Sequence, residues 1–190
     1  MPKKPQPTVF LDFDGVLTDF MGAACKLVGM DKGYLRHIYK THDTPRQAAN
    51  DVFTECEMWE AITEAGSDFW ANLEPLPWAM TLYEELQKVS KVCICTSFGN
   101  LVKRPKFASD SAKGKILWAH EHLQSNRVAV CARKELLAHP NAVLVDDYLK
   151  NCKAFAKNGG SFWLWENQFD MDDDYEQYIQ LCCDFVKGLK

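Results

Sequence analysis

The sequence contains no long apolar run, which excludes a helix that spans a membrane. Its apolar stretches are only a few residues long, whereas a bilayer requires ~20 apolar residues in succession. The opening MPKKPQP has two lysines but no apolar segment ahead of a cleavage site. We therefore expect no secretory signal and no membrane partner.

An excess of charge of one sign is also lacking. The 22 basic and 26 acidic side chains give a net charge of −4 at pH 7. A chain this close to neutrality has no global attraction for nucleic acid or an anionic membrane, so we expect no polynucleotide partner. The 190 residues, 47% of them apolar, instead suit a globular chain with one well-filled core and room for a small insert.

The cysteine patterns of zinc sites are absent. The chain has eight cysteines but no Cys-x-x-Cys pair, and no histidine lies at zinc-ligand spacing from a cysteine. Cys93, Cys95 and Cys131 lie in or at the end of apolar runs, where a thiol acts as a small core side chain. We expect reduced thiols and a cytoplasmic protein.

What the sequence does have is an alternation of short apolar runs and helical stretches. The runs are almost continuously apolar, which predicts strands covered on both faces. They cover residues 8–13, 92–96, 127–131, 142–146 and 161–165. One helical stretch begins at Pro77, and three more cover about 111–124, about 148–158 and about 173–188. Strands that alternate with helices form a parallel sheet, so the predicted fold class is α/β.

The second of these helical stretches, over about 111–124, has an apolar face of its own. Ile116, Leu117, His120 and Leu123 lie along one side of it. The sequence therefore predicts that this side contacts the rest of the protein.

One segment breaks the alternation of strands and helices. Between the first predicted strand and Pro77 there are only helical patterns with polar breaks. A gap of about 55 residues is too long for a loop in a compact domain. We therefore predict a core domain of residues 1–18 and 77–190, and a small α-helical cap of residues 19–76.

Carboxylates follow two of the predicted strands. The first strand ends in Asp12-Phe13-Asp14-Gly15, and the fourth ends in Asp146-Asp147. Because ligands bind beyond the carboxyl ends of parallel strands, we expect these four groups at one edge of the sheet. Each close pair would repel by about 4 kcal/mol at an effective dielectric of ~20. A divalent cation would relieve this repulsion, and an all-oxygen ligand set favours Mg²⁺.

Hydroxyl and ammonium groups are expected at the same edge. Thr96 and Ser97 end the second predicted strand, and Lys134 follows the third. Lys134 and Lys115 are candidate counter-charges for this edge. Each feature also has a plainer interpretation, because Asp-Gly after a strand is usually a turn and Thr-Ser or Asp-Asp often caps a helix. Their joint occurrence, each after an apolar run, favours a catalytic site.

These stretches resemble the four signature motifs of the haloacid dehalogenase-like (HAD) superfamily of phosphotransferases. The motifs are TVFLDFDGVLTDF, CICTSFGN, a later lysine and VLVDDYLKNCKAF. Within the superfamily the chain resembles the 5′(3′)-deoxyribonucleotidase family, through DGVLTDF, FWANLEPLPWAM, ICTS and KILWAHEHL. The resemblance implies a HAD-like Rossmannoid fold of three layers, with a helical cap inserted after the first strand.

The resemblance also implies a two-step hydrolysis of a phosphomonoester. Asp12 would be the nucleophile and form an aspartyl-phosphate. Asp14 would protonate the leaving alcohol and then deprotonate the attacking water. Mg²⁺ would be held by the Asp12 carboxylate, the Asp14 main-chain carbonyl and Asp146, with Asp147 ordering its waters.

Substrate contacts follow from the same resemblance. Thr96 and Ser97 would hold the phosphoryl oxygens, and Lys134 would offset developing charge, with Lys115 as a second phosphate contact. Phe20 matches a family aromatic that stacks near the nucleobase.

Other features near this edge have two interpretations each. Further aromatic side chains of the cap would either contact the substrate or form the cap's own core: Phe53, Trp59, Phe69 and Trp70. The basic stretch at 101–115, expected as a loop after Ser97, is either simply solvated or steers an anion towards the site. Tyr148 stands where these nucleotidases tend to carry a basic residue, which leaves base recognition open.

We therefore expect a Mg²⁺-dependent phosphatase of small nucleoside monophosphates, with deoxyribonucleotides favoured. The alternative is a HAD phosphatase for another small phosphate ester such as a sugar phosphate, which would differ only in the cap. A polynucleotide end-phosphatase is disfavoured by the acidic charge and by the obstructing cap. A catalytically quiet binding protein would be expected to have lost one of the acidic residues, and none is missing. Related nucleotidases are often dimers, so a homodimer is also expected, although no feature locates an interface.

Overall fold

A five-stranded parallel sheet forms the centre of the computed structural model, which describes residues 6–30, 55–165 and 175–189. The strand order is β3-β2-β1-β4-β5. The strands are β1 (Thr8–Leu11), β2 (Lys91–Thr96), β3 (Val128–Val130), β4 (Ala142–Asp146) and β5 (Ser161–Leu164). All five predicted strands and the α/β fold class are confirmed.

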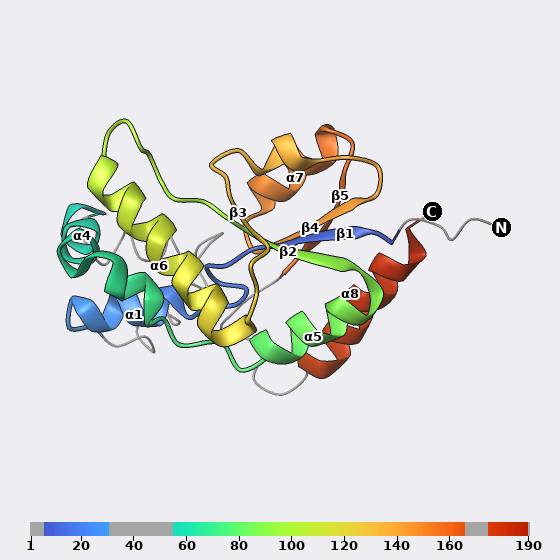
Figure 1. Ribbon diagram of the computed structural model, residues 1–190, viewed down its shortest axis with the longest axis horizontal. Coiled ribbons are helices and arrows are strands. Elements are labelled where there is room, and N and C mark those ends of the chain that lie inside the picture. The colour runs from blue at the N-terminus through green and yellow to red at the C-terminus, as the bar shows by residue number, and fades with distance from the viewer. Residues whose placement is uncertain (1–5, 31–54, 166–174, 190) are drawn as a thin grey trace.

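Helices cover both faces of the sheet and the region beyond its carboxyl edge. Figure 1 shows α7 on one face, α5 and α8 on the other, and α1, α4 and α6 grouped where the strands end. Their bounds are α1 (Phe20–Leu27), α4 (Glu55–Ala71), α5 (Ala79–Val89), α6 (Pro105–Leu123), α7 (Leu149–Lys157) and α8 (Tyr175–Gly188). A short 3-10 helix, η1 (Lys134–Leu137), follows β3. None of the helices in the described ranges is long and apolar enough to cross a bilayer.

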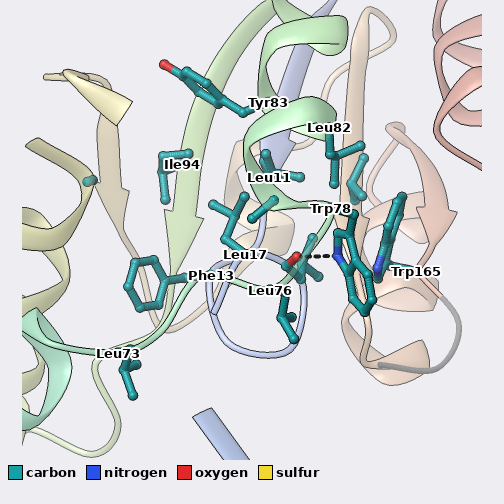
Figure 2. Close-up of a cluster of buried hydrophobic side chains, with 14 of the residues drawn as sticks. Leu11, Phe13, Leu17, Leu73, Leu76, Trp78, Leu82, Tyr83, Ile94 and Trp165 are labelled. Carbon is teal, nitrogen blue, oxygen red and sulfur yellow. Dashed lines mark hydrogen bonds between the residues drawn. The ribbon is translucent and has the colours of Figure 1, made fainter. Parts of the chain in front are cut away.

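β1 is the middle strand, and its apolar residues fill both sides of the sheet. Val9 and Leu11 belong to the large cluster shared with α5 and α8 (Figure 2). Phe10 points to the opposite side and packs edge-on against Phe155 of α7, with ring centroids 6.1 Å apart. This two-sided burial explains why the strand is continuously apolar. It also places the residues after Leu11 in the middle of the carboxyl edge.

The segment that follows β1 is hydrogen-bonded to the segment that leads into α5. The Leu76 N–H donates to the Leu17 carbonyl, and the Asp19 N–H donates to the Glu74 carbonyl, each at 2.9 Å. The outgoing and returning segments therefore cross the sheet edge side by side. The division into a core of 1–18 and 77–190 and a cap of 19–76 stays a prediction, because residues 31–54 lie outside the described part of the chain.

The helix expected over about 111–124 is α6, but it begins earlier, at Pro105. Proline suits the first turn of a helix because its missing N–H would have no partner there. The basic stretch at 101–115 is therefore helical from residue 105 onward, so the expected loop is wrong for most of its length.

The contact face of α6 also differs from the expected one. Of the four residues expected on that face, only Leu123 is buried; His120 is exposed, and Ile116 and Leu117 are exposed at 46% and 47%. The buried face instead carries Lys115 and Trp118, and the Trp118 indole N–H donates to the Leu73 carbonyl at 2.7 Å. A buried lysine thus takes a position that the apolar pattern assigned to the surface.

We expect Gly114→Ala to destabilise the protein by about 1–3 kcal/mol, the usual range for overpacking. α4 and α6 pack closely there, and a Cβ on Gly114 would collide with the Ser67 carbonyl oxygen and lie 2.5 Å from the Trp70 Cβ. Urea unfolding would measure the loss. Gly188→Ala is the matched control, since its Cβ would meet nothing within 4 Å. Equal stability of the two variants would contradict the close approach.

Candidate active site

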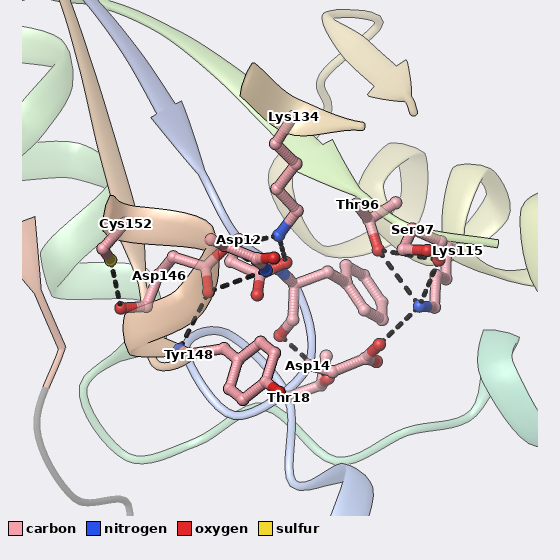
Figure 3. A network of polar contacts seen from close by, with 12 residues as sticks. Asp12, Asp14, Thr18, Thr96, Ser97, Lys115, Lys134, Asp146, Tyr148 and Cys152 are labelled. Atoms are coloured by element: carbon pink, nitrogen blue, oxygen red, sulfur yellow. Dashed lines mark hydrogen bonds and ion pairs between the residues drawn. The ribbon is translucent and has the colours of Figure 1, made fainter. Parts of the chain in front are cut away.

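Four carboxylates gather at the carboxyl edge of the sheet, as the sequence predicted for parallel strands. Asp12 follows β1 directly, and its N–H donates to the Val145 carbonyl of β4 at 2.9 Å. Asp146 ends β4 and is fully buried. Oxygens of Asp12, Asp146 and Asp147 all lie within 4.8 Å of one another. Asp14 lies beside these three residues, and it lines the cavity at this edge of the sheet together with Asp12 and Asp147 (Figure 3).

Lys134 lies between two of these carboxylates. It begins η1, and its Nζ is 2.5 Å from Asp12 Oδ1 and 2.6 Å from Asp146 Oδ2. Only 5% of the side chain is exposed. Burial alone would lower the pKa of Lys134, but the carboxylates of Asp12 and Asp146 raise it well above its ordinary value. The lysine therefore stays charged and partly neutralises the acidic cluster.

The acidic cluster is nevertheless electrostatically strained. Burial, with the Asp146 carboxylate adding to it, raises the pKa of Asp12 to about 7, against the opposing attraction of Lys134. Burial and then the Asp12 carboxylate raise the pKa of Asp147 in the same direction. Both shifts have the causes expected when like charges share a poorly solvated site.

Lys115 connects the carboxylate of Asp14 to the end of β2. Its Nζ is 2.5 Å from Asp14 Oδ2 and donates at 3.0 Å to both Thr96 Oγ1 and the Ser97 carbonyl. Only 2% of the lysine is exposed, and its ammonium lies 4.5 Å from the centre of the Trp70 ring. Ser97 lines the cavity, whereas Thr96 is fully buried beneath it. Both candidate lysines are thus placed at the site.

Asn151 is a residue of this site that the sequence reasoning missed. Its side-chain amide donates to both Asp146 oxygens, at 3.2 and 3.1 Å, from the first turn of α7. The Tyr148 N–H donates to the same carboxylate at 2.8 Å. The spacing in the sequence could have indicated this contact. Asn151 follows Asp146 by five residues, and a helix that begins directly after the strand places such a side chain over the carboxylate at the strand end.

The charged side chains described above form the polar floor of a cavity of about 260 Å³. An aromatic cluster lines the same cavity above this floor. Phe20, the first residue of α1, stacks on Trp70 at 5.4 Å and on Trp59 at 6.0 Å. Phe107 of α6 also lines the cavity and meets both tryptophans edge-on. Phe69 packs edge-on behind Phe20 and is buried. Phe53 lies outside the described residues.

The residues of this edge fit a hard divalent cation. Asp12, Asp146 and Asp147 offer only oxygen ligands, which Mg²⁺ prefers to nitrogen or sulfur. The four carboxylates are faced by two ammonium groups, those of Lys115 and Lys134. With all four carboxylates ionised, the two ammonium groups would leave two negative charges, which one divalent cation would offset.

The fold is that of HAD-like hydrolases. The structure resembles that of a haloacid dehalogenase-like hydrolase from Xanthomonas campestris with a TM-score of 0.55 at 13% identity, over 99% of this chain and 96% of that one. A HAD hydrolase from Bacillus subtilis, crystallised with bound magnesium, gives a TM-score of 0.46 at 13% identity, over 94% and 100% of the two chains.

Residues 6–174 match the family described as "5′ nucleotidase, deoxy (pyrimidine), cytosolic type C protein". The chain belongs to this family and is a hydrolase that acts on phosphate monoesters. Its substrate is accordingly a small phosphate ester. No curated protein matches the chain.

Proposed function

We propose that the protein hydrolyses deoxyribonucleoside monophosphates to nucleoside and phosphate, with Mg²⁺ and through an aspartyl-phosphate on Asp12. The observation that carries this proposal is the meeting of an acidic and basic floor with an aromatic cavity wall. The floor suits transfer of a phosphoryl group, and the wall suits the flat base attached to it. Membership of a deoxynucleotidase family supports the same conclusion.

Asp12 is held in a position that suits a nucleophile. Its Oδ1 accepts the Phe13 N–H at 2.7 Å and pairs with Lys134. No described residue donates to the other oxygen, Oδ2, which would attack phosphorus. A bond from Oδ2 to phosphorus would form while the ester bond breaks, and its electron pair would leave with the ester oxygen.

Asp14 is placed to act as the general acid in the first step and as the general base in the second. Its Oδ2 is fixed by Lys115, whereas Oδ1 is buried and has no partner among the described residues. In the first step Asp14 would donate a proton to the leaving oxygen. In the second it would accept a proton from the water that attacks phosphorus, which releases phosphate and restores the Asp12 carboxylate.

Phosphate binding would be shared between this chain and the metal. Asp12, Asp146 and the Asp14 main-chain carbonyl would hold Mg²⁺, with Asp147 beside them. The bound ion supplies charge stabilisation at the phosphoryl oxygens. Lys115 and Ser97 would hold those oxygens from the β2 side, and Thr96 beneath them accepts a hydrogen bond from the Lys115 ammonium.

The aromatic wall favours a nucleotide over a sugar phosphate. Phe20 and Trp59 line the cavity, and stacking of one base on such a ring would contribute ~1–3 kcal/mol. A sugar phosphate has no flat ring to use this surface. Tyr148 also lines the cavity, at a position where the nucleotidases that the chain resembles tend to carry a basic residue, so the site would have one fewer cation near the base.

Phosphate release from a set of substrates tests the proposal. We expect dUMP and dTMP to be hydrolysed with kcat/KM at least ~10-fold above glucose 6-phosphate, which corresponds to one stacking contact. Excess EDTA is expected to abolish the release, and added Mg²⁺ to restore it. Equal turnover of the sugar phosphate would leave a HAD phosphatase but remove the nucleotide specificity.

Two further features stay as proposals. We propose a reducing cytoplasmic location, which is supported by the free thiols of the seven cysteines whose side chains the structure describes. A homodimer is also expected, and light scattering at several protein concentrations would test it.

A further inference from the structure

Ser111 is a buried hydroxyl without a partner in the wall of the active-site cavity. The residue is 1% exposed and lines the cavity. Its Oγ makes no hydrogen bond within the part of the chain that the structure describes. A serine inside a helix commonly donates to the carbonyl four residues earlier, and Ser111 does not. A buried polar group left without a partner is unfavourable, which points to a ligand as the missing partner.

The position of Ser111 on α6 indicates which part of a ligand it would meet. Phe107, Ser111 and Lys115 are spaced four residues apart, so they lie on one face of the helix. All three line the cavity, and successive turns are ~5.4 Å apart along the axis. The cavity wall thus presents an aromatic ring, a hydroxyl and an ammonium in that order.

The two ends of this row belong to different parts of the site. Lys115 contacts Asp14 and Thr96 on the polar floor, where the phosphoryl group would lie. Phe107 contacts Trp59 and Trp70, in the aromatic cluster. A nucleotide has the same order of chemistry, with a phosphate, a sugar and a flat base. In such an alignment Ser111 would be level with the sugar.

We propose that Ser111 is a specificity-determining residue whose hydroxyl hydrogen-bonds the 3′-hydroxyl of a deoxyribonucleoside 5′-monophosphate. The inference rests on the proposed function, since it places the phosphate at Lys115. It adds that the site recognises the sugar directly, and not only the phosphate and the base. A substrate without that hydroxyl would leave Ser111 buried and unpaired, as it is in the free protein.

The test compares two substrates in two proteins. kcat/KM is measured for dUMP and for 2′,3′-dideoxyuridine 5′-monophosphate, with the unaltered protein and with Ser111→Ala. For the unaltered protein we expect dUMP to be preferred by about tenfold, which is typical for one uncharged hydrogen bond. For Ser111→Ala we expect the two substrates to differ by less than about twofold. p-Nitrophenyl phosphate, which has no sugar, should be hydrolysed equally by both proteins.

Ser90→Ala is the matched control. Ser90 is also a buried serine, but it lies at the end of α5 and donates to the Leu86 carbonyl at 2.7 Å, the bond that Ser111 lacks. Its loss should leave the preference for dUMP unchanged. Equal losses on both nucleotides in Ser111→Ala would overturn the role of the serine while leaving a nucleotidase. Absence of nucleotide hydrolysis by the unaltered protein, with p-nitrophenyl phosphate still hydrolysed, would overturn both proposals.

Discussion

Replacing Asp12 with asparagine is expected to lower kcat on the order of 10⁴-fold or more, the effect seen when a covalent nucleophile is removed. Asparagine keeps the shape of the side chain and an oxygen for the Phe13 N–H, but its amide does not attack phosphorus. Acid quenching during turnover should also trap a phosphorylated intact protein for the unaltered enzyme, and not for Asp12→Asn. Mass spectrometry measures that species.

The fold of the Asp12→Asn protein should survive. Burial and the neighbouring Asp146 already disfavour the charged form of Asp12 and raise its pKa to about 7, so a neutral replacement relieves repulsion. We expect its Tm in EDTA to be no lower than that of the unaltered protein. Activity within tenfold of the unaltered protein, in a sample with normal Tm, would rule out Asp12 as the nucleophile.

Lys134→Met should be the most destabilising of the site variants. Its removal leaves Asp12 and Asp146 buried without the cation that contacts both. Breaking a buried ion pair in this way costs about 3–5 kcal/mol. We expect a loss of this size in urea unfolding with EDTA, and a smaller loss with Mg²⁺, because a divalent cation would offset the same carboxylates.

Lys115→Met is the matched comparison for that experiment. Lys115 is equally buried, but its partner Asp14 has 32% of its side chain exposed, so water can solvate the carboxylate that loses its cation. We expect a smaller loss of stability than in Lys134→Met, and no dependence of that loss on Mg²⁺. Identical losses in the two variants, with and without Mg²⁺, would show that the neutralising role assigned to Lys134 is wrong.

The strands and the acidic edge were predictable because they depend on local sequence and one general rule. Continuous apolar runs indicate buried strands, and parallel strands end at one edge. Asp12 and Asp146 directly follow or end such runs. Their closeness in space therefore follows from topology, without knowledge of any individual contact.

The buried face of α6 was not predictable in the same way. Hydrophobic periodicity counts lysine and serine as surface residues, yet Lys115 and Ser111 are the buried ones here. They are buried because the cavity and the Asp14 carboxylate lie on that side. Ile116 and Leu117 follow the apolar pattern and are exposed. Such an inversion depends on partners far away in the sequence, which a local pattern does not contain.

During translation β1 is synthesised early, but its pairing with both neighbouring strands is completed late. Its neighbours in the sheet are residues 91–94 of β2 and residues 142–145 of β4, so one edge stays unpaired until residues 91–94 have left the ribosome and the other until residues 142–145 have. Pairings across such long loops form slowly, and an unpaired apolar strand is a template for other chains. Asp12 takes up its place beside Asp146 only when β4 has arrived. Nascent chains that stop before Ala142 should therefore be prone to aggregation and depend on chaperones.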